Sequence, residues 1–304
     1  MTPFIDADVL RYEIGHSAQF LNEEDDLVVR DWDVCKGLFD GKIEHIIKEI
    51  EENLSVKCEE PRLYLTMDRR SVPTTNRFLK NRGEPPIDFI PNFREQVATV
   101  KPYKGQRFNE KPDHYDNLTS YILNHWNSFI ANGYEADDQM AIDTLLYTKK
   151  ELPCIICSRD KDLMQVPGWH FSWECGKQGQ FGPMVVGKKG FLEEKVRDTG
   201  KKLKSGNPVL ERKGVGGGEL FFLYQLLIGD STDNIPGCPK VGHKKAYEAL
   251  SQDLSREAAY EVVKEAYEGV YGEEWKTAAE EQGRLLWLQR YHGEVWEFPY
   301  TYGG

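Results

Sequence analysis

Three short apolar runs that each end on an aspartate constrain the fold of this chain more than any other feature. They are Phe4–Asp6, Leu63–Asp68 and Cys154–Asp160. Short apolar runs bounded by polar or turn residues are typical of strands buried in a parallel sheet. The carboxyl ends of parallel strands meet at one edge of an open α/β sheet. The sequence therefore predicts that acidic side chains from distant segments converge in one crevice.

Segments with helical periodicity separate these runs. Apolar residues recur at helical spacing over 42–54, 118–130 and 135–148, and 220–228 is apolar all round, as in a buried helix. Residues 251–290 are acidic and helical in pattern. The alternation of strand and helix indicates an α/β fold with a mainly parallel central sheet flanked by helices.

The chain divides into three predicted regions. Residues 1–175 form the α/β core, which contains a basic segment at 69–117 that is rich in proline and asparagine. Such a segment is long for a loop in a compact domain, and loops of that length are usually functional or mobile. Residues 176–218 are rich in glycine and lysine and are predicted to form a mobile basic insertion. Residues 219–304 are predicted to be mainly helical.

Nine acidic residues on five segments form a candidate metal site. Helical residues three apart share a face, which applies to Glu135 with Asp138 and to Asp230 with Asp233. Helix capping and the helix dipole explain one such pair, but not acids on five segments. Asp8 competes with Asp6 for the first position. The nine candidates are Asp6, Asp68, Glu135, Asp137, Asp138, Asp160, Asp162, Asp230 and Asp233.

The type of ligand predicts the type of metal. Carboxylate oxygens without accompanying Cys or His favour magnesium or manganese. Two such ions can activate a water and stabilise the leaving oxygen of a phosphodiester. Asp160-x-Asp162 does not begin a calcium loop, because Gln165 and Phe171 stand where that loop needs glycine and glutamate.

Composition narrows the setting and the partners. The net charge of −11 argues by itself against binding nucleic acid. Two divalent ions would restore about four positive charges where the acids gather, and basic residues cluster over 69–82, 94–107 and 240–245. An acidic chain with basic stripes is compatible with a nuclease.

Six scattered cysteines do not form a disulfide framework, so we expect a reduced, intracellular setting. Cys154-x-x-Cys157 lacks a suitably spaced second pair of zinc ligands and is better explained by a buried strand. No run approaches the roughly 20 apolar residues of a membrane helix, and no secretory signal is seen at the start.

Four motifs resemble the structure-selective 5′ nucleases. This family includes phage 5′→3′ exonucleases, flap endonucleases and the 5′-nuclease domain of bacterial DNA polymerase I. The motifs are Pro102–Arg107, Gly133–Asp138, Ser158–Asp162 and Gly229–Gly237, and the resemblance covers most of residues 4–250. It implies a PIN-like 5′-nuclease fold with an arch region at 69–117 and a helix-hairpin-helix DNA clamp.

The resemblance also implies roles for individual residues. Lys104 resembles the lysine that meets the scissile phosphate, and Arg107 resembles its basic neighbour at the base of an arch through which a single strand can pass. Tyr103 and Arg94 are expected to contact DNA nearby. Asp162, Asp230 and Asp233 resemble the acids of one metal ion. The residues that resemble either ligands of the other ion or acids that support those ligands are Asp6, Asp68, Glu135, Asp137, Asp138 and Asp160.

Residues 237–246 resemble the hairpin of the duplex clamp. Glycines let a backbone approach closely, and amides at the start of the next helix accept a phosphate. Such contacts are independent of base sequence and depend strongly on salt. The resemblance implies potassium at the carbonyls of 237–242. The expected DNA contacts here are Gly237, Lys240, Gly242, Lys244 and Lys245.

We therefore expect a metal-dependent 5′→3′ exodeoxyribonuclease that acts at duplex 5′ ends or nicks, with flap and RNase H-type activity. The expected partners are DNA, RNA/DNA hybrids and replication proteins, and the expected setting is phage replication or recombination in the bacterial cytoplasm. The absence of a polymerase module favours a free-standing phage-type enzyme.

Two alternatives stay open: a flap-specific endonuclease, and a non-catalytic binder of DNA structures, in which the acids would have been lost. The long insertion between Asp68 and Lys104 leaves open whether 5′ ends thread through an arch.

Overall fold

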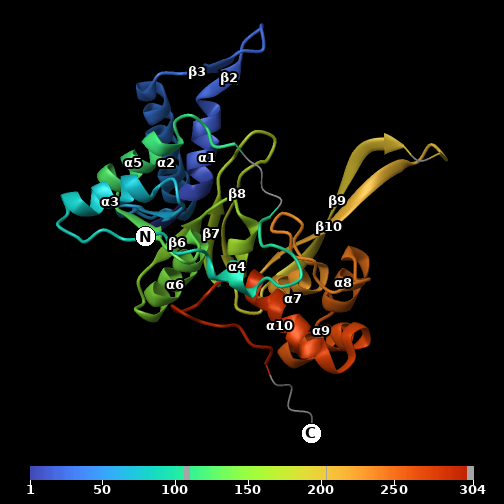
Figure 1. The fold of residues 1–304 in the computed structure, drawn as a ribbon. Helices are drawn as coiled ribbons and strands as arrows, with labels where there is room; N and C mark the ends of the chain where they lie inside the picture. The colour runs from blue at the N-terminus through green and yellow to red at the C-terminus, as the bar shows by residue number, and fades with distance from the viewer. Residues whose placement is uncertain (106–109, 203, 300–304) are drawn as a thin grey trace.

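A six-stranded sheet lies at the centre of the molecule (Figure 1). The structure is a computed structural model and describes residues 1–105, 110–202 and 204–299. Five strands run parallel and the edge strand β8 runs antiparallel, which confirms the predicted α/β class. In spatial order the strands are β5 (Ser128–Ala131), β4 (Arg62–Thr66), β1 (Thr2–Asp6), β6 (Cys154–Cys157), β7 (Gly168–Ser172) and β8 (Phe181–Val186).

Helices cover both faces of this sheet. Successive residues of a strand point to opposite faces, so each strand contributes side chains to the packing on both faces. Ile5 packs into a core with three helices on one face, whereas its neighbour Phe4 packs on the other face with α6 (Ala136–Lys149). Both faces of each central strand are thus buried, which explains why the strands read as continuous apolar runs. The three helices on the Ile5 face are α1 (Ala7–Ser17), α2 (Trp32–Leu54) and α5 (Tyr115–His125).

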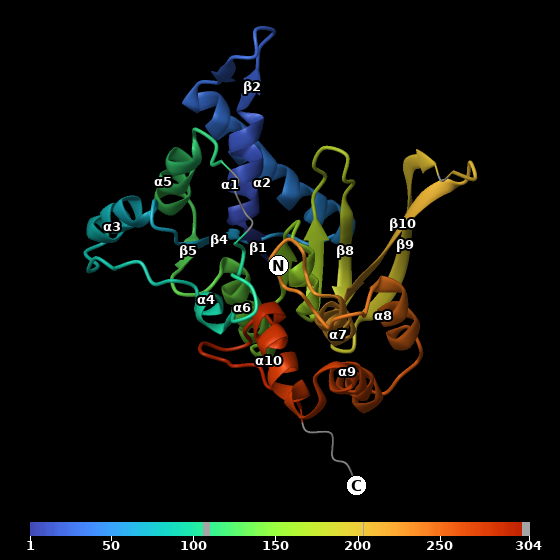
Figure 2. The ribbon, with the colours of Figure 1, turned by 45° about the vertical axis from the view of Figure 1, so that its right-hand side comes forward.

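A second core lies beside the sheet and is built mainly from helices (Figure 2). Phe222 and Tyr267 are among its fully buried side chains. The predicted helical character of the C-terminal region is therefore confirmed. Its helices are α7 (Gly218–Ile228), α8 (His243–Leu250), α9 (Arg256–Tyr271) and α10 (Trp275–Leu286), with a 3₁₀ turn η2 (Gly272–Glu274) between the last two.

The region 118–130 differs from the prediction of one helix. Helix α5 ends before Trp126, whose backbone is extended with φ −118° and ψ 154°. The residues that follow form β5, which pairs in parallel with β4. A short apolar run cannot be assigned to helix or strand by periodicity alone, because pairing with a neighbouring strand decides between them.

The segment 69–117 is also more regular than expected. It contains α3 (Val72–Asn81) and the short helix α4 (Phe93–Val97). Arg107, predicted as a basic neighbour of Lys104, lies outside the described residues.

The prediction that 176–218 forms a mobile insertion was wrong. Strand β8 completes the central sheet, and β9 (Phe191–Lys202) pairs antiparallel with β10 (Pro208–Gly217). This β9–β10 ribbon projects from the body of the molecule in both views (Figures 1 and 2).

A shorter hairpin, β2 (Gln19–Leu21) with β3 (Leu27–Val29), links α1 to α2. In the described ranges, no helix combines the length and the apolarity needed to cross a membrane.

Candidate metal centre and nucleic-acid interface

Asp6 and Asp160 come together at the carboxyl ends of two neighbouring parallel strands, β1 and β6. Asp6 caps α1 by accepting from the Val9 amide (3.1 Å). Ser158 donates its hydroxyl to Asp6 (2.6 Å) and accepts from the Asp160 amide (2.9 Å), so it holds both segments. Burial, then the charges of Asp8 and Asp160, raise the pKa of Asp6 to about 7. The predicted convergence of acids at the sheet edge is present at these two strands.

The start of α6 brings further carboxylates to the same place. Glu135 is the N-cap residue of this helix. Burial raises the pKa of Asp137 well above its usual range, and the charges of Asp6, Asp160 and Glu135 raise it further. These repulsions show that the acids of α6 face those of β1 and β6. Together with Asp68 they line one cavity of about 510 Å³, which Lys104 also lines.

Lys104 reaches this cavity from the segment before α5. Its ammonium pairs with Glu135 and lies 3.9 Å from Asp233, and its amide donates to the Asp233 carbonyl (3.0 Å). Its backbone is left-handed, with φ 53°, a conformation that costs free energy outside glycine. The Tyr103 hydroxyl lies 3.1 Å from Asp233 and 3.2 Å from Glu135. Tyr103 therefore positions Glu135 and Asp233. The sequence analysis predicted a DNA contact for Tyr103 and did not predict this role.

A second group of acids gathers around Lys161. This lysine pairs with Asp162 (2.9 Å) and with Asp230. Burial and the charge of Asp160 raise the pKa of Asp162 to about 6. Burial also acts to raise the pKa of Asp230, but Lys161 and the Thr232 amide lower it below its ordinary value. The sequence analysis did not single out Lys161, although its place between two predicted ligands was the available signal.

Asp68 also lines the first cavity, where Lys111, Tyr115 and Ser71 hold it in place. The sequence analysis did not single out these three residues. Asp68 pairs with Lys111 and accepts from the Tyr115 hydroxyl (2.7 Å) and the Ser71 amide (2.8 Å). Burial acts to raise its pKa, yet the hydrogen bonds from Lys111 and Tyr115 lower it overall.

Asp138 and Arg94 correct the predicted site. The side chains of Arg94 and Asp138 are 1% and 0% exposed and form a two-pronged ion pair with N–O distances of 2.6 and 2.8 Å. Asp138 also accepts from the amides of Glu135 (3.1 Å) and Gln289 (2.9 Å). Asp138 is fully buried against Arg94 and does not line the cavity that the other acids share, so the structure does not bring it into the metal site. Arg94 is too buried to contact DNA, so that prediction was wrong.

Asp6 and Asp8 both line the first cavity. One oxygen of Asp8 accepts from Arg11 (2.7 Å) and the other from the Thr66 amide (2.9 Å). One oxygen of Asp6 accepts from the Val9 amide (3.1 Å) and the other from the Ser158 hydroxyl (2.6 Å). These hydrogen bonds do not separate the two residues, and the choice of Asp6 stays a prediction.

The predicted hairpin lies between α7 and α8. Gly229 and Gly237 both have positive φ, and their backbones touch: a Cβ on Gly229 would stand 2.2 Å from the Ile235 carbonyl oxygen. Gly237 is buried and its amide donates to Gln282 (3.1 Å), so this amide does not face DNA as predicted. Gly242 is exposed as the N-cap of α8. Three exposed lysines surround it, namely Lys240, Lys244 and Lys245.

The donor set fits a hard divalent cation, because it consists of carboxylates and contains no Cys or His. Across the described residues, however, no three Asp, Glu, His or Cys side chains already form a group ready to hold a metal ion. Lysine ammonium groups contact these carboxylates instead, from Lys104, Lys111 and Lys161. All three lysine side chains are partly exposed, at 26%, 24% and 55%.

Comparisons with known proteins bear on this site. The chain is 28% identical over 180 residues to a 5′-3′ exonuclease of Mycobacterium tuberculosis, a match that covers 55% of this chain and 50% of that protein. It is 32% identical over 123 residues to DNA polymerase I of Rhizobium leguminosarum, which covers 40% of this chain and 10% of the polymerase. The chain thus spans about half the length of the exonuclease it matches. No protein-family model matches it.

Solved structures give more distant similarities. The T5 5′-exonuclease with bound zinc is 13% identical, with 94% of this chain and 86% of that chain covered and a TM-score of 0.47. A complex of the T5 D15 flap endonuclease with DNA and metal ions is 12% identical, with 94% and 98% covered and a TM-score of 0.42.

Proposed function

We propose that this chain, a relative of 5′-3′ exonucleases and of DNA polymerase I, is a metal-dependent nuclease that hydrolyses phosphodiesters from the 5′ ends of duplex DNA. The named relatives support the nuclease class. One observation carries the assignment to this site: Asp6, Asp137 and Asp160 line one cavity together with Lys104. Such a concentration of buried charge costs stability unless a cation compensates it, and it is typical of a functional site.

The residues that would hold two Mg²⁺ or Mn²⁺ ions fall into two groups. When bound, such ions activate a water and stabilise the leaving oxygen of the phosphodiester. Asp162, Asp230 and Asp233 would hold one ion. The other would be held by Asp6, Asp68, Glu135, Asp137 and Asp160.

The surrounding residues position the substrate. Lys104 would turn from Glu135 to the phosphate and offset the charge that develops there. Tyr103 keeps Glu135 and Asp233 in place while this happens.

The hairpin before α8 would bind the duplex away from the cut. The Gly242 helix start and the exposed lysines around it offer amides and positive charge to a phosphate. Potassium at the carbonyls of 237–242 would add to this contact. Contacts of this kind carry no base information, so binding would be independent of sequence.

We extend the proposal to nicks, 5′ flaps and the RNA strand of hybrids as substrates. The proposed setting is phage DNA replication or recombination in a bacterial cell, alongside replication proteins.

Digestion of a 5′-labelled blunt duplex with and without Mg²⁺ tests the function. Wild type should release labelled mononucleotides only with the metal, and Asp160→Asn should reduce the rate by roughly 100-fold or more. Asp253→Asn is the matched control, because the Asp253 side chain is 100% exposed and pairs only with Lys189 among the described residues. Equal rates for wild type and Asp160→Asn would refute the assignment.

A parallel digestion of a 5′-flap duplex separates the two kinds of nuclease. Mononucleotides from both substrates support an exonuclease. Long flap oligomers without mononucleotides would show a flap-specific endonuclease instead.

A further inference from the structure

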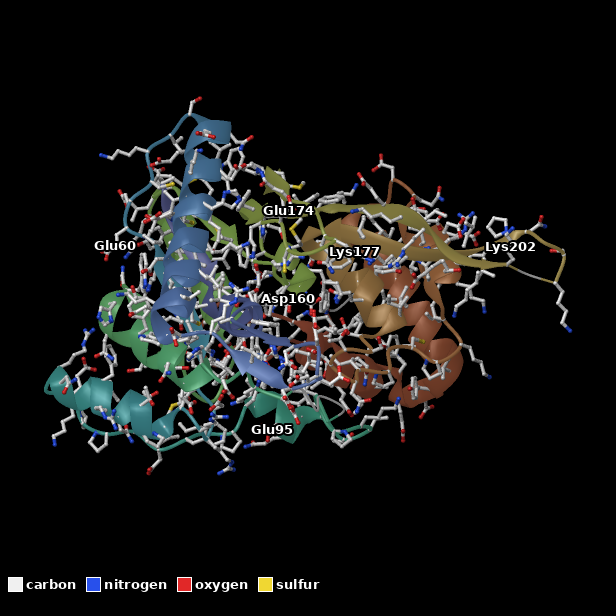
Figure 3. The ribbon with its side chains drawn as sticks, turned by 90° about the horizontal axis from the view of Figure 1, so that it is seen from above. Glu60, Glu95, Asp160, Glu174, Lys177 and Lys202 are labelled. Carbon is white, nitrogen blue, oxygen red and sulfur yellow. The ribbon has the colours of Figure 1, made fainter. Side chains whose placement is uncertain are left out.

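A second cavity, of about 440 Å³, lies between the edge of the central sheet, helix α7 and the β9–β10 ribbon. At one end it is lined by Asp160 and Asp230, which belong to the candidate metal centre. At the other end it is lined by residues of the ribbon. Figure 3 shows Asp160 near the centre of the molecule and Lys202 towards the far end of the ribbon. A strand bound at the acids has room to continue beneath the ribbon.

The register of the ribbon decides which of its side chains face this cavity. Cross-strand partners share a face of a two-stranded sheet. Lys195 pairs with Lys213, and both residues line the cavity. The next pair outward on the same face is Arg197 with Glu211, which carry opposite charges. The ribbon thus has one face directed at the cavity, and the two lysines are its basic pair.

The opposite face anchors the base of the ribbon to the body. Glu194 pairs with Arg212 and with His243 of α8 (2.9 Å). The amide of Gly214 donates to the hydroxyl of the buried Tyr224 on α7 (2.9 Å). These contacts fix the orientation of the ribbon, so the cavity-facing side is held in place.

Two lysines directly opposite each other are unfavourable in an isolated hairpin, because like charges on cross-strand partners repel. Among the described residues, neither Lys195 nor Lys213 has an ion-pair partner, and both are exposed. Glu193 also lines the cavity, one pair closer to the body, without contacting either ammonium. An anion bound between the two lysines would remove the repulsion.

Aromatic side chains supply a second kind of contact in the same cavity. Phe181, the first residue of β8, is 40% exposed and lines the cavity together with Phe191 at the base of the ribbon. An exposed ring beside a pair of lysines provides a surface for a base next to a site for its phosphate.

We propose that the cavity-facing side of the ribbon binds the sugar-phosphate backbone of the substrate strand next to the cleavage site. Lys195 and Lys213 hold a phosphate, and a base stacks on Phe181. This proposal rests on the proposed nuclease function and deepens it, because it places a second backbone contact outside the hairpin before α8.

The salt dependence of DNA binding tests the lysine pair. The variants are made in the Asp160→Asn protein, so that a labelled duplex with Mg²⁺ is bound without being cut. A Lys195→Gln/Lys213→Gln variant should bind more weakly. Its plot of log affinity against log salt should be shallower by about 0.7 to 0.9, the value for one lost phosphate contact. Lys149→Gln/Lys150→Gln, at the end of α6, is the control with the same loss of charge and should keep the parent slope.

Phe181→Ala tests the stacking contact. It should weaken binding by roughly tenfold and leave the salt slope unchanged, because no charge is lost. A Lys195/Lys213 variant with the slope of the control would overturn the proposal, and a Phe181→Ala variant with the parent affinity would overturn its stacking contact. A wild type that neither binds nor cuts DNA would refute the nuclease function itself, which is a different result.

Discussion

At the scale of single residues, basic side chains balance the acids of this molecule in two different ways. Lys104 and Lys161 are partly exposed and pair with acids of the candidate metal centre. Arg94 is fully buried and saturates Asp138. Asp138, three positions after Glu135, therefore has a structural role. The sequence pattern does not distinguish it from the aspartates that are predicted to bind a metal ion.

The buried Arg94–Asp138 pair should matter more for stability than any exposed pair. Asp138→Asn leaves a buried guanidinium without its counter-charge, which should lower the free energy of unfolding by about 3–5 kcal/mol. Urea unfolding measures the change. Glu52→Gln breaks the exposed Lys48–Glu52 pair, whose side chains are 67% and 62% exposed, and should cost no more than about 1 kcal/mol. Similar losses in the two variants would contradict the assignment.

His170 predicts a pH dependence of stability. Burial lowers its pKa from 6.5 to about 4, while its ring lies 2.7 Å from the Val166 carbonyl. The unfolded chain therefore binds a proton at a higher pH than the folded chain. The stability that the neutral His170 ring contributes is present above pH 6.5 and is lost as the pH falls towards 4.

Between pH 7 and pH 5 this loss amounts to about 2 kcal/mol. Urea unfolding of wild type and His170→Gln at the two pH values isolates it, because the other titrating groups are common to both proteins. The difference between pH 7 and pH 5 should be about 2 kcal/mol smaller in the variant. An unchanged difference would show that His170 does not set it.

At the scale of elements, glycines decide where the chain can turn. The hairpin between α7 and α8 requires Gly229 at φ 74°, with no room for a side chain. The sequence analysis predicted close backbone approach for the glycines of 237–246, and Gly229 lies before that segment. The spatial partner of the turn, Gln282 of α10, was not readable.

Two Gly→Ala variants should have opposite effects on stability. Gly229→Ala places a Cβ 2.2 Å from a carbonyl oxygen and should unfold at lower urea concentration than wild type. Gly41 lies inside α2 with nothing within 4 Å of its Cβ position, so Gly41→Ala should add about 0.5–1 kcal/mol. A stabilising Gly229→Ala would contradict the described hairpin.

At the scale of the whole molecule, the acids link the sheet layer to the helical core. The segment after α10 returns to the sheet, where Leu288 packs against α6 and the Gln289 amide donates to Asp138. Gln225 of α7 donates to Asp162 (2.5 Å). The carboxylates that gather near this junction repel one another.

Magnesium should therefore stabilise the whole molecule. A ligand at roughly 100 times its Kd adds about 2.7 kcal/mol, which corresponds to a rise in Tm of about 5 °C for a chain of this size. Thermal unfolding in EDTA and in Mg²⁺ measures the rise. Asp137→Asn removes one repelling charge, so it should raise the Tm in EDTA and reduce the response to Mg²⁺. A Tm that is indifferent to Mg²⁺ would argue against a metal centre.

The sequence by itself determined the strands β1, β4 and β6, the start of α6 with its acids, and the convergence of Asp6 with Asp160. Local spacing and apolar periodicity are sufficient for these, because strand ends in a parallel sheet share an edge. The prediction that Asp230 and Asp233 lie at a helix start was wrong, because they lie in a turn after α7 ends at Ile228. The sequence did not determine β5, the β9–β10 ribbon or the burial of Arg94. Each of these depends on a partner far along the chain: β4 for β5, α7 and α8 for the ribbon, and Asp138 with the Leu285 and Trp287 carbonyls for Arg94. Only the tertiary structure brings such partners together, and it alone decided which acids pair with a buried arginine and which with partly exposed lysines.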